Sequence, residues 1–122
     1  MLEFNKSVND IRGTIMFYSF GKLIINFVET KKGFSRGGHH YKFKSVHILL
    51  QGKIEFKELD LDTNMEQIRI MSTPYIISVE PNMAHILTAL DDSLFLECFD
   101  TEYFAIDYLP YRNIVNEKMK RS

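Results

Sequence analysis

The sequence has little cysteine, no strong excess of either charge and no long apolar stretch. Its one cysteine, Cys98, cannot form an intramolecular disulfide, which is typical of a reducing compartment. The formal net charge of -1 gives no basic surface of the kind that nucleic-acid binding normally needs. No stretch approaches the length of a membrane span, and the first ten residues lack the basic start and apolar run of a signal peptide. We therefore expect a cytoplasmic protein that binds neither nucleic acid nor membrane.

Several common catalytic and binding motifs are also missing. The sequence contains no Walker-type or dinucleotide-binding glycine loop, no CxxC pair and no GxSxG serine motif. It has no low-complexity segment, long linker or clear repeat that would mark a domain boundary. A length of 122 residues with 45% hydrophobic residues is ordinary for one globular unit. We expect residues 1–122 to form a single domain.

Short runs rich in Ile, Val, Phe and Tyr, each ended by a turn signal, dominate the chain. The runs expected to be strands are Thr14–Phe20, Lys22–Glu29, Ser45–Gln51, Lys53–Phe56, Glu66–Ser72, Tyr75–Glu80, Ala84–Leu90 and Leu94–Phe99. Gly21 and Gly52 separate neighbouring runs as tight turns would. Only Asn113–Arg121 has a helical pattern, with basic residues near its end. The sequence predicts an all-β sandwich or small barrel with a short C-terminal helix.

One run changes its alternation part-way. Ile54 and Phe56 share one face of an extended chain, whereas Leu59 and Leu61 share the other. This predicts either a bulge near Lys57 or a strand that is covered on both faces.

Three of the candidate polar residues follow a glycine-containing basic loop, Lys31–Gly38. If the chain is extended there without a further bulge, His39, Tyr41 and His47 share one face and His40 takes the other. Adjacent histidines beside such a loop are equally typical of solvated residues. The site hypothesis therefore needs support from elsewhere in the chain.

Two later residues supply candidates of the same kind. His85 follows a turn and opens an apolar strand, where a histidine is more often a satisfied core or rim residue than a ligand. Glu97 interrupts the apolar run SLFLECF, so it must be paired, metal-bound, protonated or facing solvent. It alternates with Leu96 and Cys98, and this keeps the solvent-facing interpretation open. The hypothesis is a polar site centred on His39 and His85.

These pieces together resemble a cupin, a double-stranded β-helix or jelly-roll barrel. The first cupin motif runs glycine, His-x-His, glutamate, glycine, and the matching positions are Gly38, His39, Tyr41, Ser45 and Gly52. The second motif resembles the segment 80–85, which ends in a histidine. Tyr41 and Ser45 stand where the motif has its second histidine and its glutamate. Of the four usual metal ligands only His39 and His85 remain, which favours a cupin without a metal cofactor. A metal cupin in which His40, His47 or Glu97 substitutes is the alternative.

Within cupins, the chain is most similar to two groups of enzymes that act on nucleotide-linked keto sugars. These are the dTDP-4-dehydrorhamnose 3,5-epimerases and the dTDP-4-keto-6-deoxyhexose 3,4-ketoisomerases. The matching segments are Asp10-Ile11-Arg12-Gly13, Arg36-Gly37-Gly38-His39, Pro81 to His85 with Ser93 to Phe99, and Ile106 to Tyr111. The resemblance covers most of the chain through short motifs.

This resemblance implies a role for each candidate residue. Arg12 and Arg36 would hold the nucleotide diphosphate or the sugar, and His39 would remove the proton beside the ketone. Tyr41 would act as an acid or hydrogen-bond donor, and the same pocket would be lined by His47, His85 and Glu97.

The implied function is a metal-independent isomerase or epimerase of a nucleotide-linked 4-keto-6-deoxy sugar. A non-catalytic cupin that binds a sugar or another small ligand, or a metal cupin with altered ligands, remains an alternative. Cupins commonly dimerise by lending an N-terminal strand, and Thr14–Glu29 is apolar on both faces. We therefore expect a homodimer.

Overall fold

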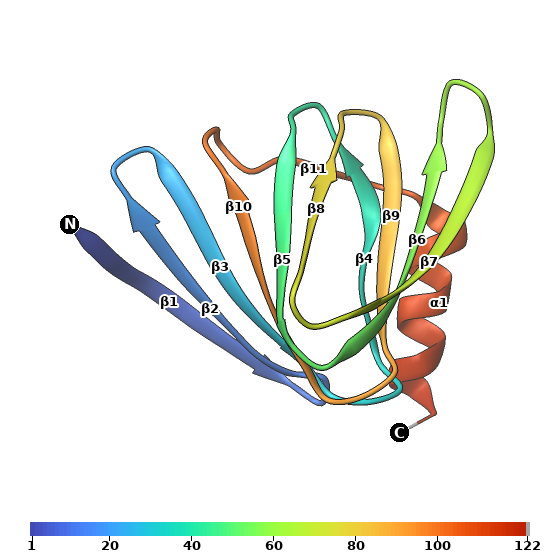
Figure 1. The fold of residues 1–122 in the computed structure, drawn as a ribbon, viewed down its shortest axis with the longest axis horizontal. Coiled ribbons are helices and arrows are strands. Elements are labelled where there is room, and N and C mark those ends of the chain that lie inside the picture. The colour runs from blue at the N-terminus through green and yellow to red at the C-terminus, as the bar shows by residue number, and fades with distance from the viewer. Residues whose placement is uncertain (122) are drawn as a thin grey trace.

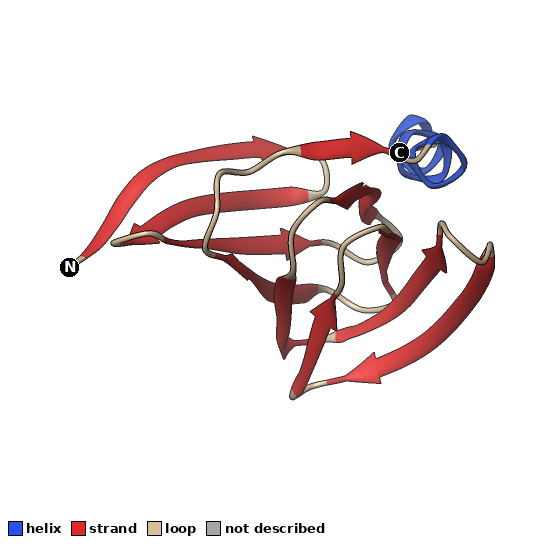
Figure 2. Ribbon diagram, turned by 90° about the horizontal axis from the view of Figure 1, so that it is seen from above, coloured by secondary structure: helices blue, strands red, loops and turns tan. Residues whose placement is uncertain are grey.

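Two antiparallel β-sheets and one helix make up the molecule (Figures 1 and 2). The computed structural model describes residues 1–121. One sheet has the order β1-β2-β3-β10-β5-β8, formed by Leu2–Asp10, Gly13–Phe20, Leu23–Thr30, Ser93–Phe99, Ser45–Gln51 and Tyr75–Val79. The other has the order β11-β4-β9-β6-β7, formed by Ala105–Asp107, Ser35–Tyr41, Met83–Ala89, Lys53–Asp60 and Met65–Ser72. The mostly β architecture with a C-terminal helix confirms the predicted fold class.

The structure contains strands that were not predicted, and it shifts the ends of others. β1 and β11 were not expected, because β1 is largely polar and β11 is only three residues long. The basic loop is shorter than predicted, since β4 begins at Ser35. The helix α1 covers Leu109–Lys120 and so begins four residues before Asn113. Its early start places Pro110 in the first turn, where proline is favoured because its missing N–H is not needed.

The two sheets enclose an apolar core between them. Its buried members come from both sheets: Val28, Leu49, Ile54, Phe56, Met71, Ile77, Val79, Leu87 and Phe95. Side chains alternate along each strand, so every second residue of these strands faces the interior. This core fills one part of the interior, and the rest is a cavity lined by both polar and apolar side chains.

Helix α1 covers the outer face of the five-stranded sheet, as Figure 2 shows from above. Its Tyr111 and Val115 pack on Leu59 of β6 and on residues of β9. β6 keeps an unbroken register with both neighbours, so the bulge expected near Lys57 is wrong. The alternative, a strand covered on both faces, is confirmed.

No helix among residues 1–121 is long and apolar enough to cross a membrane.

A β-bulge in β4 sets the direction of the side chains that follow it. Arg36 lies opposite Leu87 and His39 lies opposite His85, so three steps on β4 match two steps on β9. Gly37 and Gly38 supply the extra residue, with φ of 96° and 84°, a region that favours glycine. A Cβ on Gly38 would also come within 2.8 Å of Arg112. The bulge therefore lets Arg36 and His39 both face the interior.

Candidate functional site

A cavity of about 480 Å³ opens between the two sheets beside the apolar core. Its polar lining includes all seven residues predicted for the site: Arg12, Arg36, His39, Tyr41, His47, His85 and Glu97. His39 and Tyr41 line it from β4 and His47 lines it from β5 in the other sheet, so the three side chains converge as predicted. They do so across the two sheets, because a turn between β4 and β5 interrupts the extended chain from which a common face was predicted. His40 takes the opposite face of β4 and is absent from the lining. The structure thus brings the candidates together, while their chemical roles remain predictions.

Glu97 lies at the centre of a hydrogen-bonded network inside the barrel. Its strand β10 runs between β3 and β5, so Asn26 and His47 lie directly opposite it on either side. The Asn26 amide donates to Oε1 over 3.2 Å, and the Tyr41 hydroxyl donates to Oε2 over 2.8 Å. His47 Nε2 lies 3.0 Å from the same Oε2. The solvent-facing interpretation of Glu97 is therefore wrong.

This network determines the charge states of Glu97 and Tyr41. Burial raises the pKa of Glu97, but the hydrogen bond and charge of His47, followed by the Tyr41 hydroxyl, outweigh it and lower the pKa to about 2. Burial and the Glu97 charge raise the pKa of Tyr41 far above its usual range. At neutral pH the pair is thus a carboxylate and a phenol that donates to it.

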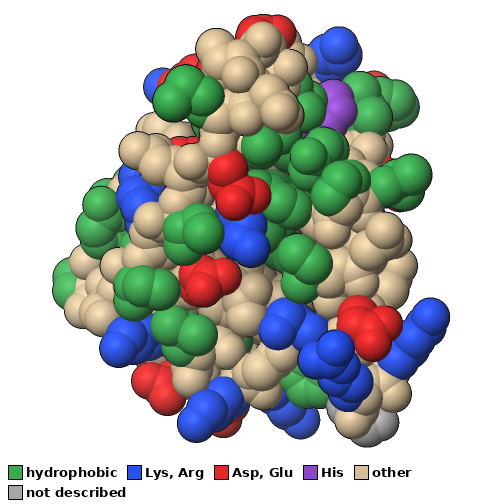
Figure 3. Space-filling model, turned by 90° about the vertical axis from the view of Figure 1, so that its right-hand side faces the viewer, with side chains coloured by type: hydrophobic (Ala, Val, Ile, Leu, Met, Phe, Trp, Pro, Cys, Tyr) green, Lys and Arg blue, Asp and Glu red, His purple; other side chains and the backbone are tan. Residues whose placement is uncertain are grey.

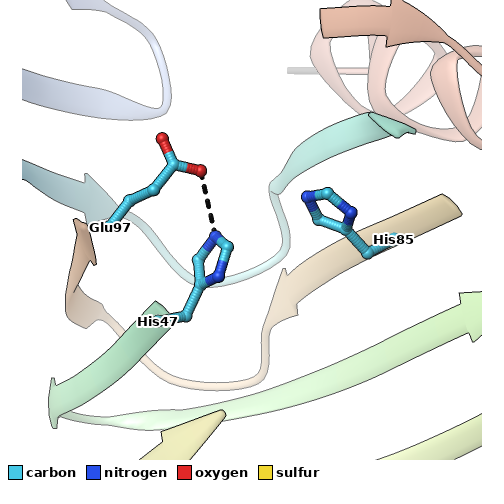
Figure 4. A group of neighbouring side chains, drawn as sticks. All are labelled: His47, His85 and Glu97. Carbon is cyan, nitrogen blue, oxygen red and sulfur yellow. Dashed lines mark hydrogen bonds and ion pairs between the residues drawn. The ribbon is translucent and has the colours of Figure 1, made fainter. Parts of the chain in front are cut away.

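His85 is a neutral imidazole held in one orientation. It is only 1% exposed, and burial, with the charges of His47 and His39, lowers its pKa to about 3. Its Nδ1 lies 3.1 Å from the Met83 carbonyl oxygen. A carbonyl only accepts, so Nδ1 carries the proton and Nε2 keeps its lone pair. The other ring nitrogen faces the His47–Glu97 pair in Figure 4.

His39 is the second neutral imidazole of the cavity. Its ring centroid lies 5.6 Å from that of His85 and 5.5 Å from that of Tyr41. Burial lowers its pKa, and Glu97 raises it in part. A neutral imidazole can accept a proton, and the nearby carboxylate stabilises the cation that results.

Positive side chains line the same cavity. Arg12 forms an ion pair with Asp10 over 2.8 Å. Arg36 is the more deeply buried of the two, and its guanidinium donates to the Glu29 carbonyl over 2.7 Å and to Thr30 Oγ1 over 3.3 Å. Burial, then the charge of Arg12, lowers the pKa of Arg36 to about 10, so it stays charged at neutral pH. Arg36 is a fixed positive charge in the wall, whereas Arg12 is partly exposed.

Three donors in this network lie close enough to hold a metal ion. One ligand atom from each of His47, His85 and Glu97 lies within 4.8 Å of the others (Figure 4). Two imidazole nitrogens and one carboxylate are a donor set typical of divalent transition metals. The Nδ1–H of His85 is bound by a carbonyl, as it is in most metal-bound histidines. The residues present therefore fit a metal, through a different set from the cupin motif.

Comparisons with known proteins give matches in structure and none in sequence. No protein-family model matches the sequence, and no curated protein matches it. The capsular polysaccharide assembling protein CapF from Staphylococcus aureus superposes with a TM-score of 0.71 at 14% identity, over 88% of this chain and 31% of that one.

Oxalate decarboxylases superpose similarly. The formate complex from Lactobacillus farciminis gives a TM-score of 0.73 at 19% identity, over 81% of this chain and 31% of that one. A Bacillus subtilis enzyme, described for its Mn(II) centres, gives 0.74 at 14% identity, over 84% and 30%. The chain spans about a third of the length of these structures.

The chain has the cupin fold. The fold expectation is confirmed, whereas the particular resemblance to ketoisomerases and epimerases stays a prediction. In this cupin barrel the position of the motif's glutamate holds Ser45, which is buried and whose Oγ has no hydrogen-bond partner within the described residues. The acidic group of the site comes from Glu97 on a different strand.

Five further polar residues of the cupin cavity were missed by sequence reasoning. They are Asn5, Lys6, Asn26, Tyr103 and Arg112. Asn26 carried a signal, since it is the lone amide in the apolar run KLIINFV. Arg112 carried none, because its place depends on the helix packing beside the β4 bulge, where it donates to the Gly37 carbonyl over 2.8 Å.

Proposed function

We propose that this cupin binds a nucleotide-linked 4-keto-6-deoxy sugar and moves the proton beside its ketone without a metal. The observation that carries the proposal is the neutral imidazole of His39 in a cavity that also holds Arg12 and Arg36. A diphosphate is recognised by guanidinium groups, and a cavity of about 480 Å³ is in the range of ligand sites. CapF, a sugar-polymer assembling protein by its description, has the same fold.

The chemistry assigned to His39 is a proton transfer in two halves. Its free ring nitrogen takes the proton from the carbon next to the ketone, and the electron pair moves to the carbonyl oxygen as an enediolate. In an isomerisation the imidazolium gives the proton to the carbon that carried the ketone, while the hydroxyl on the first carbon loses its proton to become the new ketone and the former carbonyl oxygen gains one. In an epimerisation a donor on the opposite face protonates the first carbon, and His39 releases its proton to solvent. Glu97 stabilises the imidazolium by its charge, and Tyr103 and Tyr41 are the nearby hydroxyl donors.

The partners of Glu97 stabilise its charge inside the barrel. Both of its oxygens accept hydrogen bonds, from Asn26 on one side and from Tyr41 and His47 on the other. These bonds satisfy the buried carboxylate without an ion, which is compatible with the proposed metal-free reaction.

Deuterium exchange tests the proposal. Several nucleotide-linked 4-keto-6-deoxyhexoses are incubated with the protein in D₂O, and NMR follows deuterium at the carbon beside the ketone. His39→Gln should slow exchange roughly 100-fold or more, as expected for removal of a general base. His40→Gln, the neighbour on the other face, is the matched control and should exchange like the parent.

Two results would count against this function. Full exchange by His39→Gln removes the assigned base. Tight sugar-nucleotide binding in calorimetry with no exchange by the parent protein would instead support the non-catalytic cupin.

The donor triad supports a second candidate, a divalent-metal centre. His47, His85 and Glu97 would hold the ion, which would act as a Lewis acid on a ligand's oxygen. Elemental analysis of protein purified without a His-tag, followed by Mn(II) titration monitored by EPR, tests this. His85→Gln should weaken Mn(II) binding at least tenfold, and His40→Gln should not. Equal affinity in the two variants would exclude the triad.

A further inference from the structure

Helix α1 supplies a third guanidinium to the cavity through Arg112 in its first turn. β11 pairs with β4 only from His39 onward, so the strand edge at Gly37 and Gly38 is left to the helix. The Tyr108 backbone N–H donates to the Gly38 carbonyl over 2.9 Å, and Arg112 Nη1 donates to the Gly37 carbonyl over 2.8 Å. The β4 bulge therefore holds this guanidinium at the wall of the cavity.

The three guanidinium groups of the cavity differ in what their N–H groups already bind. Arg36 donates to Thr30 Oγ1 and to two carbonyl groups, and Arg12 donates to the Asp10 carboxylate and to one carbonyl. Asp10 Oδ2 also lies 2.8 Å from Arg12 Nη2 and 3.8 Å from Arg36 Nη1, which offsets their charge. The Arg112 guanidinium makes a single hydrogen bond within residues 1–121 and no ion pair there. Since a guanidinium has five N–H groups, most of those of Arg112 are available to a ligand.

Arg112 lies beside the base assigned above. A Cβ on Gly38, the residue before His39, would come within 2.8 Å of Arg112 Cδ, and both His39 and Arg112 line the cavity. Burial lowers the pKa of His39, the Glu97 charge raises it, and the Arg112 charge lowers it further. The guanidinium is therefore within electrostatic reach of the imidazole. Tyr41 is a weaker donor to a ligand, because its hydroxyl already donates to Glu97.

Other basic residues of α1 face solvent. Lys120 and Arg121 are exposed, and Arg121 Nη2 lies 3.5 Å from Glu117 Oε1 on the same helix. The side of the molecule that carries β7 and α1 has acidic and basic side chains scattered over its surface (Figure 3). Arg112 is half-buried and turned into the cavity, so its position is not that of an ordinary surface charge.

We propose that Arg112 binds the ketone oxygen of the sugar and stabilises the enediolate. This inference rests on the proposed function. When His39 takes the proton, the C–H bond breaks and its electron pair forms a carbon–carbon double bond, while the π pair of the carbonyl moves to the oxygen. The oxygen then carries negative charge, so a fixed guanidinium binds it more tightly than it binds the neutral ketone. Arg112 itself transfers no proton.

Deuterium exchange into dTDP-4-keto-6-deoxyglucose in D₂O tests this role. Arg112→Gln should lower kcat for exchange roughly 100-fold and leave KM nearly unchanged, because the lost interaction is strongest in the transition state. Arg112→Lys keeps the charge and should lose less. Arg121→Gln, on the same helix, is the matched control and should exchange like the parent. Guanidinium ion, added well below denaturing concentrations, should restore part of kcat to Arg112→Ala and none to His39→Gln.

Calorimetry with dTDP separates this role from phosphate binding. Arg112→Gln should bind dTDP with the affinity of the parent, because dTDP has no ketone. Weaker dTDP binding with a raised KM would make Arg112 a phosphate ligand and overturn the inference. A loss of kcat in Arg112→Ala that guanidinium does not restore, with a lowered urea midpoint, would assign it a structural role instead.

Failure of this inference and failure of the proposed function give different results. If the parent exchanges, His39→Gln does not and Arg112→Gln matches the parent, the role of Arg112 is wrong and the proposed function stands. A parent that binds dTDP and never exchanges would overturn both.

Discussion

The interior of this barrel has two parts that the same strands build in different ways. β5 contributes Leu49 to the apolar core and His47 to the cavity, and β9 contributes His85 to the cavity and Leu87 where the core and the cavity meet. In the core, burial and close packing lower the free energy of the folded state. In the cavity, buried polar groups gain little net stability from one another. Some of their atoms, such as His47 Nδ1 and Asn26 Oδ1, have no hydrogen-bond partner in the described chain. We infer that the core sets stability and that the polar part is arranged for a ligand.

Removing a core side chain should destabilise the folded protein more than any other change considered. Phe56 is fully buried between the sheets, and Phe56→Ala should lower the free energy of unfolding by about 3–5 kcal/mol. Urea unfolding followed by circular dichroism measures the change. Phe104→Ala is the control, because Phe104 is largely exposed and its loss should change little. Equal effects of the two changes would contradict the assignment of the core.

Lowering the pH should have the next largest effect on stability, through the buried titratable residues of the cavity. The folded-state pKa of His85, about 3, lies below its unfolded value of 6.5, so below pH 6.5 protons bind to the unfolded chain first. The contribution of Glu97 is present above its unfolded pKa of 4.5 and is lost as pH falls towards about 2. The free energy of unfolding of metal-free protein should therefore be steady above pH 6.5. Protonation of His85 should lower it by about 1.4 kcal/mol per pH unit below pH 6.5, and protonation of Glu97 should add a similar slope below pH 4.5.

A histidine variant separates the two contributions. His85→Gln should reduce the decline between pH 6.5 and 4.5, to which His39 and His40 also contribute because burial lowers the pKa of each, and should keep the decline below 4.5. Unfolding measured in urea at half-unit pH steps gives both slopes. A parent slope that His85→Gln leaves intact would show that other groups cause the loss.

Loss of one hydrogen bond in the network should have a smaller effect. Tyr41→Phe removes the donor to Glu97 Oε2, and we expect a loss of about 1–2 kcal/mol, because the acceptor is charged. In a double-mutant cycle with Glu97→Gln, the second change should cost less once the first is made. Additive losses would mean that the 2.8 Å contact contributes nothing measurable.

The smallest effect should have the opposite sign. Ser45 Oγ is buried and has no hydrogen-bond partner among residues 1–121, so Ser45→Ala should be neutral or stabilise ligand-free protein by up to about 1 kcal/mol. Ser35→Ala is the matched control, because Ser35 Oγ lies 2.6 Å from Thr88 Oγ1 and should lose about 1 kcal/mol. If Ser45→Ala destabilises the protein as much as Ser35→Ala, the polar part contributes to stability in the same way as the rest.

Most strands were predictable because alternation and turn residues are local signals. The face to which a residue points was not predictable in β10, although the alternation of Glu97 with Leu96 and Cys98 was correct. Hydrophobicity normally separates the inner face from the outer one. Here the outward residues of β10 and its neighbours, such as Leu96, Phe27 and Ile48, are themselves apolar, so the sequence could not show that Glu97 points inward. The network around Glu97 was equally hidden, because Asn26, His47 and Tyr41 meet only when β3, β5, β10 and β4 are assembled.

The two glycines of the β4 bulge also determine whether His39 or His40 faces the cavity. Arg36 and His39 are an odd number of residues apart, and the bulge converts that odd spacing into a shared direction. Inserting one residue between them while keeping the bulge would turn His40 inward and His39 outward. Most strand sites tolerate conservative substitution, but this one is sensitive to length. In a set of diverged sequences, single-residue gaps at this point would mark the proteins that have exchanged one imidazole for the other.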